Sequence, residues 1–157
     1  MRIAAGAYIL NSGLEKLKAD SETRERLHGF ASGTYPVVKN LEPEQFVTGL
    51  GVAEAALGSA LLLPYVVSDE VAGLALTAFS VGLLRLYATT PGLRKEGSLR
   101  PTRDGSAIAK DSWLAGIGVT LMLSGLGSRR TGRLVRKAKE RRREAKESVG
   151  RWAVEAR

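Results

Sequence analysis

The sequence contains no cysteine, and its 157 residues include a single histidine, His28. Without cysteine the chain forms no disulfide, no thiolate metal site and no thiol redox centre of its own. A metal or haem site made only of histidines would need ligands from another chain. No catalytic or cofactor motif stands out, so the sequence indicates no catalytic residue and leaves open whether the protein is an enzyme.

An excess of positive charge is also absent over most of the chain. Residues 1–128 contain 12 Lys/Arg and 12 Asp/Glu, whereas residues 129–157 contain the other 12 Lys/Arg and only 4 Asp/Glu. The C-terminal segment therefore carries the whole net charge of +8. Mean hydropathy near zero is typical of a soluble domain, but the average conceals this division. We predict one domain over residues 1–128, followed by a basic tail over residues 129–157.

Charge is missing altogether from residues 55–67 and 71–84, which are apolar or small on all sides. A helix of a water-soluble bundle would instead combine an apolar stripe with a polar face. A helix that crosses ~30 Å of hydrocarbon needs ~20 mostly apolar residues. We therefore expect an all-α protein, a four-helix transmembrane bundle rich in small residues that allow close helix packing. Its spans are predicted at residues 2–17 (a short one), 47–67, 71–90 and 107–127.

The distribution of Lys and Arg predicts how the bundle is oriented. Residues 129–146 hold ten Lys/Arg next to the fourth span, whereas the loops 18–46 and 91–106 together hold eight. Positively charged segments stay on the cytoplasmic side. We expect a multi-pass protein of a bacterial cell membrane with both termini in the cytoplasm. The outer segment 18–46 is too apolar for a free loop, and we expect it to form a short helix from about Ser21 that caps the bundle or lies in the interface.

Six ionisable residues fall within the predicted spans, all in the outer half of the bundle. A charge at the centre of a span costs roughly 3 kcal/mol on insertion scales, so such groups usually face the interior and form pairs. We predict pairing of Glu54 with Arg85, and of an acidic with a basic residue among the rest. The set either holds the four helices in register or forms a polar site that binds a ligand or handles protons. Its members are Glu15, Lys16, Glu54, Arg85, Lys110 and Asp111.

The basic tail is predicted to interact with lipid. Its apolar residues recur at helical spacing, which is typical of a helix lying on an anionic inner leaflet, where each basic residue contributes about 1 kcal/mol. Nucleic-acid binding is the alternative for such a run of charge, but we do not expect it for a segment tethered to a membrane. A disordered, solvated tail is the third interpretation.

The sequence resembles the DoxX family of small bacterial membrane proteins over about residues 2–127. The resemblance rests on SGLEKL (12–17), GVAEAALG (51–58) and above all TPGLRKEGSLRPTRDGSAIAKDSWLAGIG (90–118). It implies a four-helix membrane bundle. It also implies an association with redox work, because some members are described as subunits of quinone-linked sulfur-oxidising enzymes and others as membrane partners of oxidative-stress proteins.

Three functions remain open at this point. The first is a structural or accessory membrane subunit, with the lipid bilayer and membrane or redox proteins as partners. The second is a subunit of a quinone-linked oxidoreductase, in which Glu54 or Asp111 passes protons and Arg85 or Lys110 holds a quinone oxygen. The third is a carrier of a small molecule or lipid. A closed charge network would favour the first function, and an open cavity reaching Glu54 would favour the second or third.

Overall fold

The structure is a computed structural model that describes residues 1–95, 97–103 and 105–155. Over these residues the chain forms helices and loops and no β-strand, apart from one isolated bridge between Arg94 and Pro101. The all-α class is therefore confirmed. In chain order the helices are α1 (Arg2–Leu17), α2 (Ser21–Thr34), the 3-10 helix η1 (Pro36–Asn40), α3 (Pro43–Leu62), α4 (Asp69–Thr89), α5 (Ser106–Lys110) and α6 (Ser112–Glu155).

Helix boundaries differ from the predicted spans where proline and polar residues intervene. Helix α1 coincides with the first stretch, and α4 begins two residues earlier than predicted, where the Ser68 side chain accepts a hydrogen bond from Val71 N. Helix α3 begins at Pro43, whose fixed φ suits a first turn, and it ends at Leu62 rather than at residue 67. Pro64 explains the early end, because the residue before a proline is disfavoured in the α conformation.

Two helices, α3 and α4, are long and apolar enough to cross a membrane, among the residues that the structure describes. Helix α1 has 16 residues, or about 24 Å at 1.5 Å per residue, which is short of the hydrocarbon thickness. The predicted fourth span is divided between α5 and the first part of α6.

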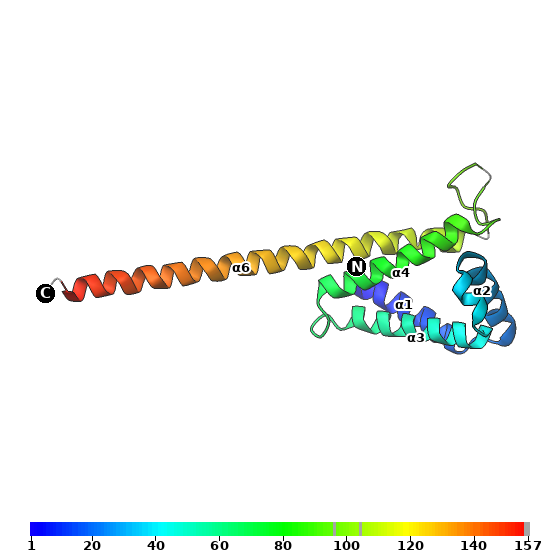
Figure 1. The fold of residues 1–157 in the computed structure, drawn as a ribbon, viewed down its shortest axis with the longest axis horizontal. Helices are drawn as coiled ribbons and strands as arrows, with labels where there is room; N and C mark the ends of the chain where they lie inside the picture. The colour runs from blue at the N-terminus through cyan, green and yellow to red at the C-terminus, as the bar shows by residue number, and fades with distance from the viewer. Residues whose placement is uncertain (96, 104, 156–157) are drawn as a thin grey trace.

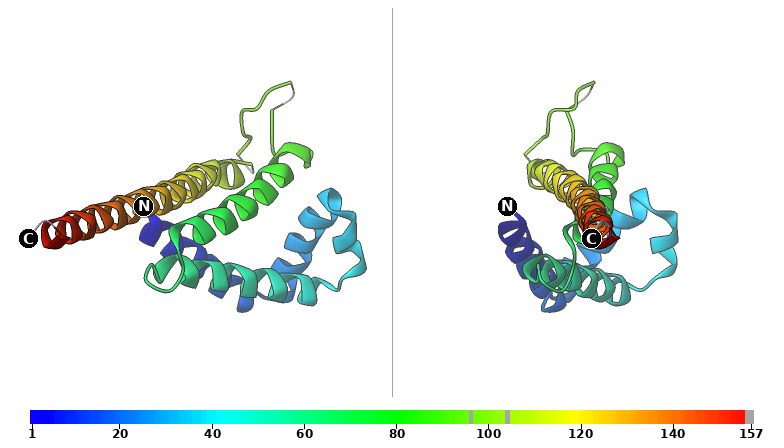
Figure 2. Two further views of the ribbon diagram at one scale, coloured as in Figure 1. Left: turned by 60° about the vertical axis from the view of Figure 1, so that its left-hand side comes forward. Right: turned by 90° about the vertical axis from the view of Figure 1, so that its left-hand side faces the viewer.

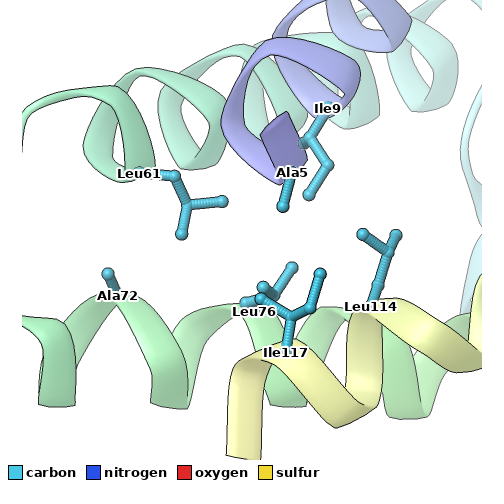
Figure 3. Close-up of a cluster of buried hydrophobic side chains, with 7 residues drawn as sticks. All are labelled: Ala5, Ile9, Leu61, Ala72, Leu76, Leu114 and Ile117. Atoms are coloured by element: carbon cyan, nitrogen blue, oxygen red, sulfur yellow. The ribbon is translucent and has the colours of Figure 1, made fainter. Parts of the chain in front are cut away.

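The helices form two closely packed pairs, α1 with α3 and α4 with α6 (Figure 1). Between the pairs lies a layer of buried aliphatic side chains, which Figure 3 shows pointing toward one another from α1 and α3 on one side and from α4 and α6 on the other. The layer consists of Ala5, Ile9, Leu61, Ala72, Leu76, Leu114 and Ile117.

Glycines allow the close contact within each pair. A Cβ added at Gly13 of α1 would lie 2.6 Å from the backbone N of Ala55 in α3. One added at Gly118 of α6 would lie 2.8 Å from the backbone N of Thr77 in α4. Both distances are shorter than a van der Waals contact, so these positions exclude any larger residue without a shift of the helices. The predicted role of small residues in helix packing is confirmed here, although Gly116 faces open space.

Arg2 joins the two pairs at the end of the bundle where the chain begins. Its guanidinium forms an ion pair with Asp69 at the start of α4. It also donates hydrogen bonds to the carbonyl oxygens of Leu61, Ala60 and Val67, at 2.8–2.9 Å. Arg2 is only 8% exposed. It satisfies carbonyl groups that the end of α3 and the following turn would otherwise leave without a partner.

Helix α2 and η1 lie across the other end of the bundle, as Figure 2 shows. Asp20 caps the start of α2 by accepting a hydrogen bond from Thr23 N at 2.9 Å. The far end of the segment is held to α4 by Thr34, whose hydroxyl lies 2.9 Å from that of Thr89, and by Tyr35, whose hydroxyl donates to Gly82 O at 2.9 Å. The helix and the capping position expected for the segment 18–46 are both present.

Helix α6 continues without a break across residue 128 and extends well beyond the rest of the molecule (Figure 1). Its 44 residues correspond to about 66 Å. Residues 131–141 are all exposed. The first half of the tail is thus a single helix without packing partners among the described residues, collinear with the segment that packs on α4.

Candidate ligand-binding cavity

Glu54 lies in the interior of the bundle and is paired with Lys16. The carboxylate is on the face of α3 that packs against α1, and it is 3% exposed. Lys16 Nζ lies 2.8 Å from Glu54 Oε2 and also donates to Ser12 Oγ at 2.8 Å. Ser12 and Lys16 are four residues apart on α1 and therefore share one face of that helix. The predicted pairing of Glu54 with Arg85 is wrong, because the neighbouring helix α1 supplies the cation.

Arg85 and Glu15 lie away from this pair. The Arg85 side chain is exposed, and its guanidinium carbon lies 5.3 Å from the centre of the Tyr35 ring, a cation–π distance. Glu15 is exposed and accepts a hydrogen bond from Asn11 Nδ2 at 2.7 Å. Neither residue contributes to the interior of the bundle.

Lys110 and Asp111 point in different directions although they are adjacent in sequence. They lie where α5 ends and α6 begins, and this break in the helix separates their side chains. Lys110 is exposed. Asp111 faces inward, and its Oδ1 is buried and accepts no hydrogen bond from the residues that the structure describes. Asp111 lies close enough to Glu54 and Lys16 for both charges to act on it.

A cavity of about 520 Å³ reaches Glu54 from between the helices. Its walls are mostly apolar, and its polar residues come from α1, α2 and α3 and from the junction of α5 and α6. Tyr8 and Phe30 line it and are also exposed, so it is accessible from the outside. The lining residues are Tyr8, Ile9, Ser12, Lys16, Arg26, Leu27, Phe30, Ala31, Tyr35, Phe46, Leu50, Glu54, Ala78, Phe79, Gly82, Leu83, Leu86, Leu93, Ile108, Asp111 and Leu114.

Three of the six predicted site residues, Lys16, Glu54 and Asp111, line this cavity, whereas Glu15, Arg85 and Lys110 do not. The sequence analysis missed the aromatic residues of the walls. All three phenylalanines of the chain line the cavity, and so do two of its four tyrosines. Their positions in the sequence do not indicate a shared site, because they are spread over four segments that meet only in the folded bundle.

No group of three or more His, Cys, Asp or Glu side chains is placed to hold a metal ion within the described part of the chain. The polar groups of the cavity are an ion pair, three hydroxyls, a guanidinium and one further carboxylate. These groups are suited to hydrogen bonding and charge pairing with an organic molecule. Comparison of the chain with protein-family models, with curated proteins and with solved structures finds no match.

Proposed function

We propose that this chain is an integral membrane protein that binds a small, mostly apolar molecule in the cavity between its helices. One observation carries the proposal: the cavity extends to Glu54 and is lined mainly by apolar side chains, with polar groups grouped around the ion pair of Lys16 and Glu54. Apolar walls with a few convergent polar groups are the usual form of a small-molecule site.

The membrane part of the proposal is supported by the surfaces of α3 and α4. Only 28% of the apolar window of each helix is buried inside the molecule. Val52, Leu74 and Val81 are more than half exposed. Apolar helices at the core of a soluble protein would be buried, and large exposed apolar surfaces are unfavourable in water. A bilayer would cover the exposed sides of these two helices.

In this proposal α1 and α6 cross the membrane together with α3 and α4, as the pairing of the helices allows. The ends of the bundle then fit the orientation expected from charge. The N-terminus and the basic extension of α6 lie toward one end, and α2 lies across the other (Figure 1). Both termini would be cytoplasmic, and α2 would lie at the outer surface.

Quinone fits the cavity as one molecule of the proposed class. Its ring would contact the apolar walls, and Lys16, Ser12 and Tyr8 offer hydrogen-bond donors for a ring oxygen. A quinone would supply two-electron redox chemistry when bound. This chain's own residues would orient the ring and exclude water. The resemblance to DoxX proteins points the same way.

A structural or accessory role is the second candidate, and the ion pairs favour it. Lys16 with Glu54 joins α1 to α3, and Arg2 with Asp69 joins α1 to α4. These contacts hold the bundle in one register whether or not a ligand binds. A partner in the membrane would then supply the activity.

Extraction of the purified protein with organic solvent, followed by mass spectrometry, tests the binding function. The informative variant is Ala78→Phe, which fills the cavity, and the matched control is Ala75→Phe, one turn earlier on α4 and outside the cavity. We expect wild type and Ala75→Phe to retain a small molecule that is enriched over membrane lipid, and Ala78→Phe to lose it. If both variants retained equal amounts of the molecule, or if wild type retained none, the binding function would be wrong and the accessory role would be favoured.

The tail is proposed to bind anionic lipid only through its first turns. Because α6 is straight, residues 129–155 extend about 40 Å from the bundle, whereas surface charges are screened beyond about 8 Å at physiological ionic strength. Removing residues 142–157 should therefore leave salt-sensitive binding to phosphatidylserine vesicles largely intact. Charge-neutral replacement of Arg133, Arg136 and Lys137 should weaken it. The opposite result would show that the distal tail bends onto the membrane.

A further inference from the structure

The walls of the cavity are unusually aromatic for this chain. Of nine aromatic residues in the sequence, five line the cavity, namely Tyr8, Phe30, Tyr35, Phe46 and Phe79. They come from α1, α2, the start of η1, α3 and α4, so they surround the space from several sides. The faces of aromatic rings carry negative potential and attract cations.

One of these rings already binds a cation. The guanidinium of Arg85 lies 5.3 Å from the centre of the Tyr35 ring. The Tyr35 hydroxyl donates to Gly82 O, which fixes the ring between η1 and α4. Tyr35 thus lines the cavity and also lies at a cation–π distance from Arg85.

The acidic groups of the cavity are not fully compensated. Lys16 is engaged by Glu54 and Ser12. Arg26 also lines the cavity, but its side chain is exposed, and no ion pair joins it to Asp111 among the described residues. Asp111 forms no ion pair within the described residues, and its Oδ1 is buried without a hydrogen-bond donor among them. A buried carboxylate oxygen without a hydrogen-bond donor is unfavourable, and a positively charged ligand beside it would compensate its charge.

We infer that the ligand of this cavity is an organic cation with an apolar body, held by Asp111 and by the aromatic walls. The apolar body would contact Ile9, Leu50 and Leu83, and the positive centre would lie near Asp111 and the ring faces. This inference rests on the proposed binding function, specifies its substrate class and favours a cation over the neutral quinone named above. A neutral ligand would leave Asp111 uncompensated, and an anionic ligand would be repelled by it.

Two ions of the same shape and opposite charge test the inference. Tetraphenylphosphonium and tetraphenylborate are titrated, with neutral triphenylphosphine as a third probe, against the full chain in phosphatidylcholine nanodiscs by isothermal calorimetry. We expect the phosphonium ion to bind at least tenfold more tightly than either of the other probes. Zwitterionic lipid removes the surface potential, and the heat measured with empty nanodiscs is subtracted for each probe, because the dipole potential of the bilayer favours the borate.

Single substitutions identify the residues that make the cavity select a cation. Asp111→Asn should weaken binding of the phosphonium ion about tenfold, and Phe79→Leu should weaken it several-fold while keeping the wall apolar. Lys110→Gln, beside Asp111 but exposed and outside the cavity, should leave binding unchanged. Phe79→Leu preserves the test if Asp111→Asn does not fold, as judged by size-exclusion chromatography.

The outcomes separate the two proposals. Equal or tighter binding of the neutral or anionic probe, abolished by Ala78→Phe, would overturn the cation inference and keep the binding function. Phosphonium binding that both Asp111→Asn and Phe79→Leu leave unchanged would also overturn the inference. If none of the three probes binds, the cation inference is overturned, and the solvent extraction with Ala78→Phe and Ala75→Phe decides the binding function.

Discussion

Glu54 carries its charge in the interior of the bundle, and Lys16 compensates it. Removing one partner of a buried ion pair leaves the other charge without compensation, which typically costs 3–5 kcal/mol. Lys16→Met should therefore lower the free energy of unfolding by about 3 kcal/mol. The measurement is unfolding in mixed detergent micelles, followed by circular dichroism.

Two controls accompany this variant. The double variant Lys16→Met/Glu54→Leu should recover most of the lost stability, because replacement of a whole buried pair by apolar residues is often neutral. Arg85→Met should cost less than about 1 kcal/mol, as is usual for an exposed charge. A larger loss for Arg85→Met than for Lys16→Met would mean that the pairing in the structure is wrong.

Among single residues, the sequence predicted that Glu54 would be buried and paired, but it did not predict correctly which cation would pair with it. Glu54 stood out because a carboxylate within an apolar run requires compensation. Its partner was predicted as Arg85 and is Lys16, because the sequence does not show that α1 packs against α3. The contacts of Arg2 with three carbonyl oxygens and Asp69 have no signature in the sequence.

Between elements, the contact of α4 with α6 depends on Gly118. A Cβ there would lie 2.5 Å from Thr77 Oγ1 and 2.8 Å from Thr77 N. Gly118→Ala should therefore destabilise the protein by about 1–3 kcal/mol, the usual cost of overpacking. Gly116, on the same helix, faces open space. Gly116→Ala should be neutral or stabilise by up to about 1 kcal/mol, since alanine favours the helix.

Detergent unfolding of the two glycine variants side by side is the measurement. Equal effects of Gly116→Ala and Gly118→Ala would show that α4 and α6 do not pack through this face.

Helix α2 depends on the carboxylate of Asp20 at its start. Hydrogen bonds from the side chain and backbone of Thr23 lower the pKa of Asp20 in the folded protein. A carboxyl group whose pKa is lowered by folding stabilises the folded state at pH above its unfolded pKa. That contribution is lost as the pH falls through the folded pKa.

An Asp20→Asn variant keeps a capping side chain but removes the titration. The protection factors of amide hydrogens in α2, which are corrected for the intrinsic exchange rate at each pH, should therefore fall at acidic pH more in wild type than in this variant. Identical acid dependence in the two proteins would show that Asp20 does not cap the helix.

The helices themselves were predictable from apolar runs, and their ends less so. Ser68 and Pro43 set starts that lie outside the apolar stretches, because capping and the fixed φ of proline recruit polar residues into a helix. Pro64 stopped α3 within a run that hydropathy alone would extend to residue 67. The cavity could not be predicted, since its aromatic walls come from segments that the sequence does not relate to one another.

For the whole molecule, the sequence predicts a neutral body followed by a basic tail. It does not predict that the tail continues the helix before it. We expected a tail lying along the membrane. Helix α6 runs straight through the junction at residue 128 in the structure, and its contact with lipid stays a prediction. The Gly and Ser residues around residue 128 do not interrupt the helix, because glycine lowers helix stability without preventing it.

We have proposed that four helices of the bundle cross the membrane and that both termini lie in the cytoplasm. The absence of cysteine allows a direct test by labelling single introduced cysteines in intact spheroplasts with a membrane-impermeant maleimide. The positions are Lys39→Cys near α2, Tyr65→Cys between α3 and α4, and Ala138→Cys in the tail, all of them exposed. We expect Lys39→Cys to be labelled in intact spheroplasts, and Tyr65→Cys and Ala138→Cys to be labelled only after permeabilisation. Labelling of Tyr65→Cys or Ala138→Cys in intact spheroplasts, or release of the protein from membranes by alkaline carbonate, would contradict it.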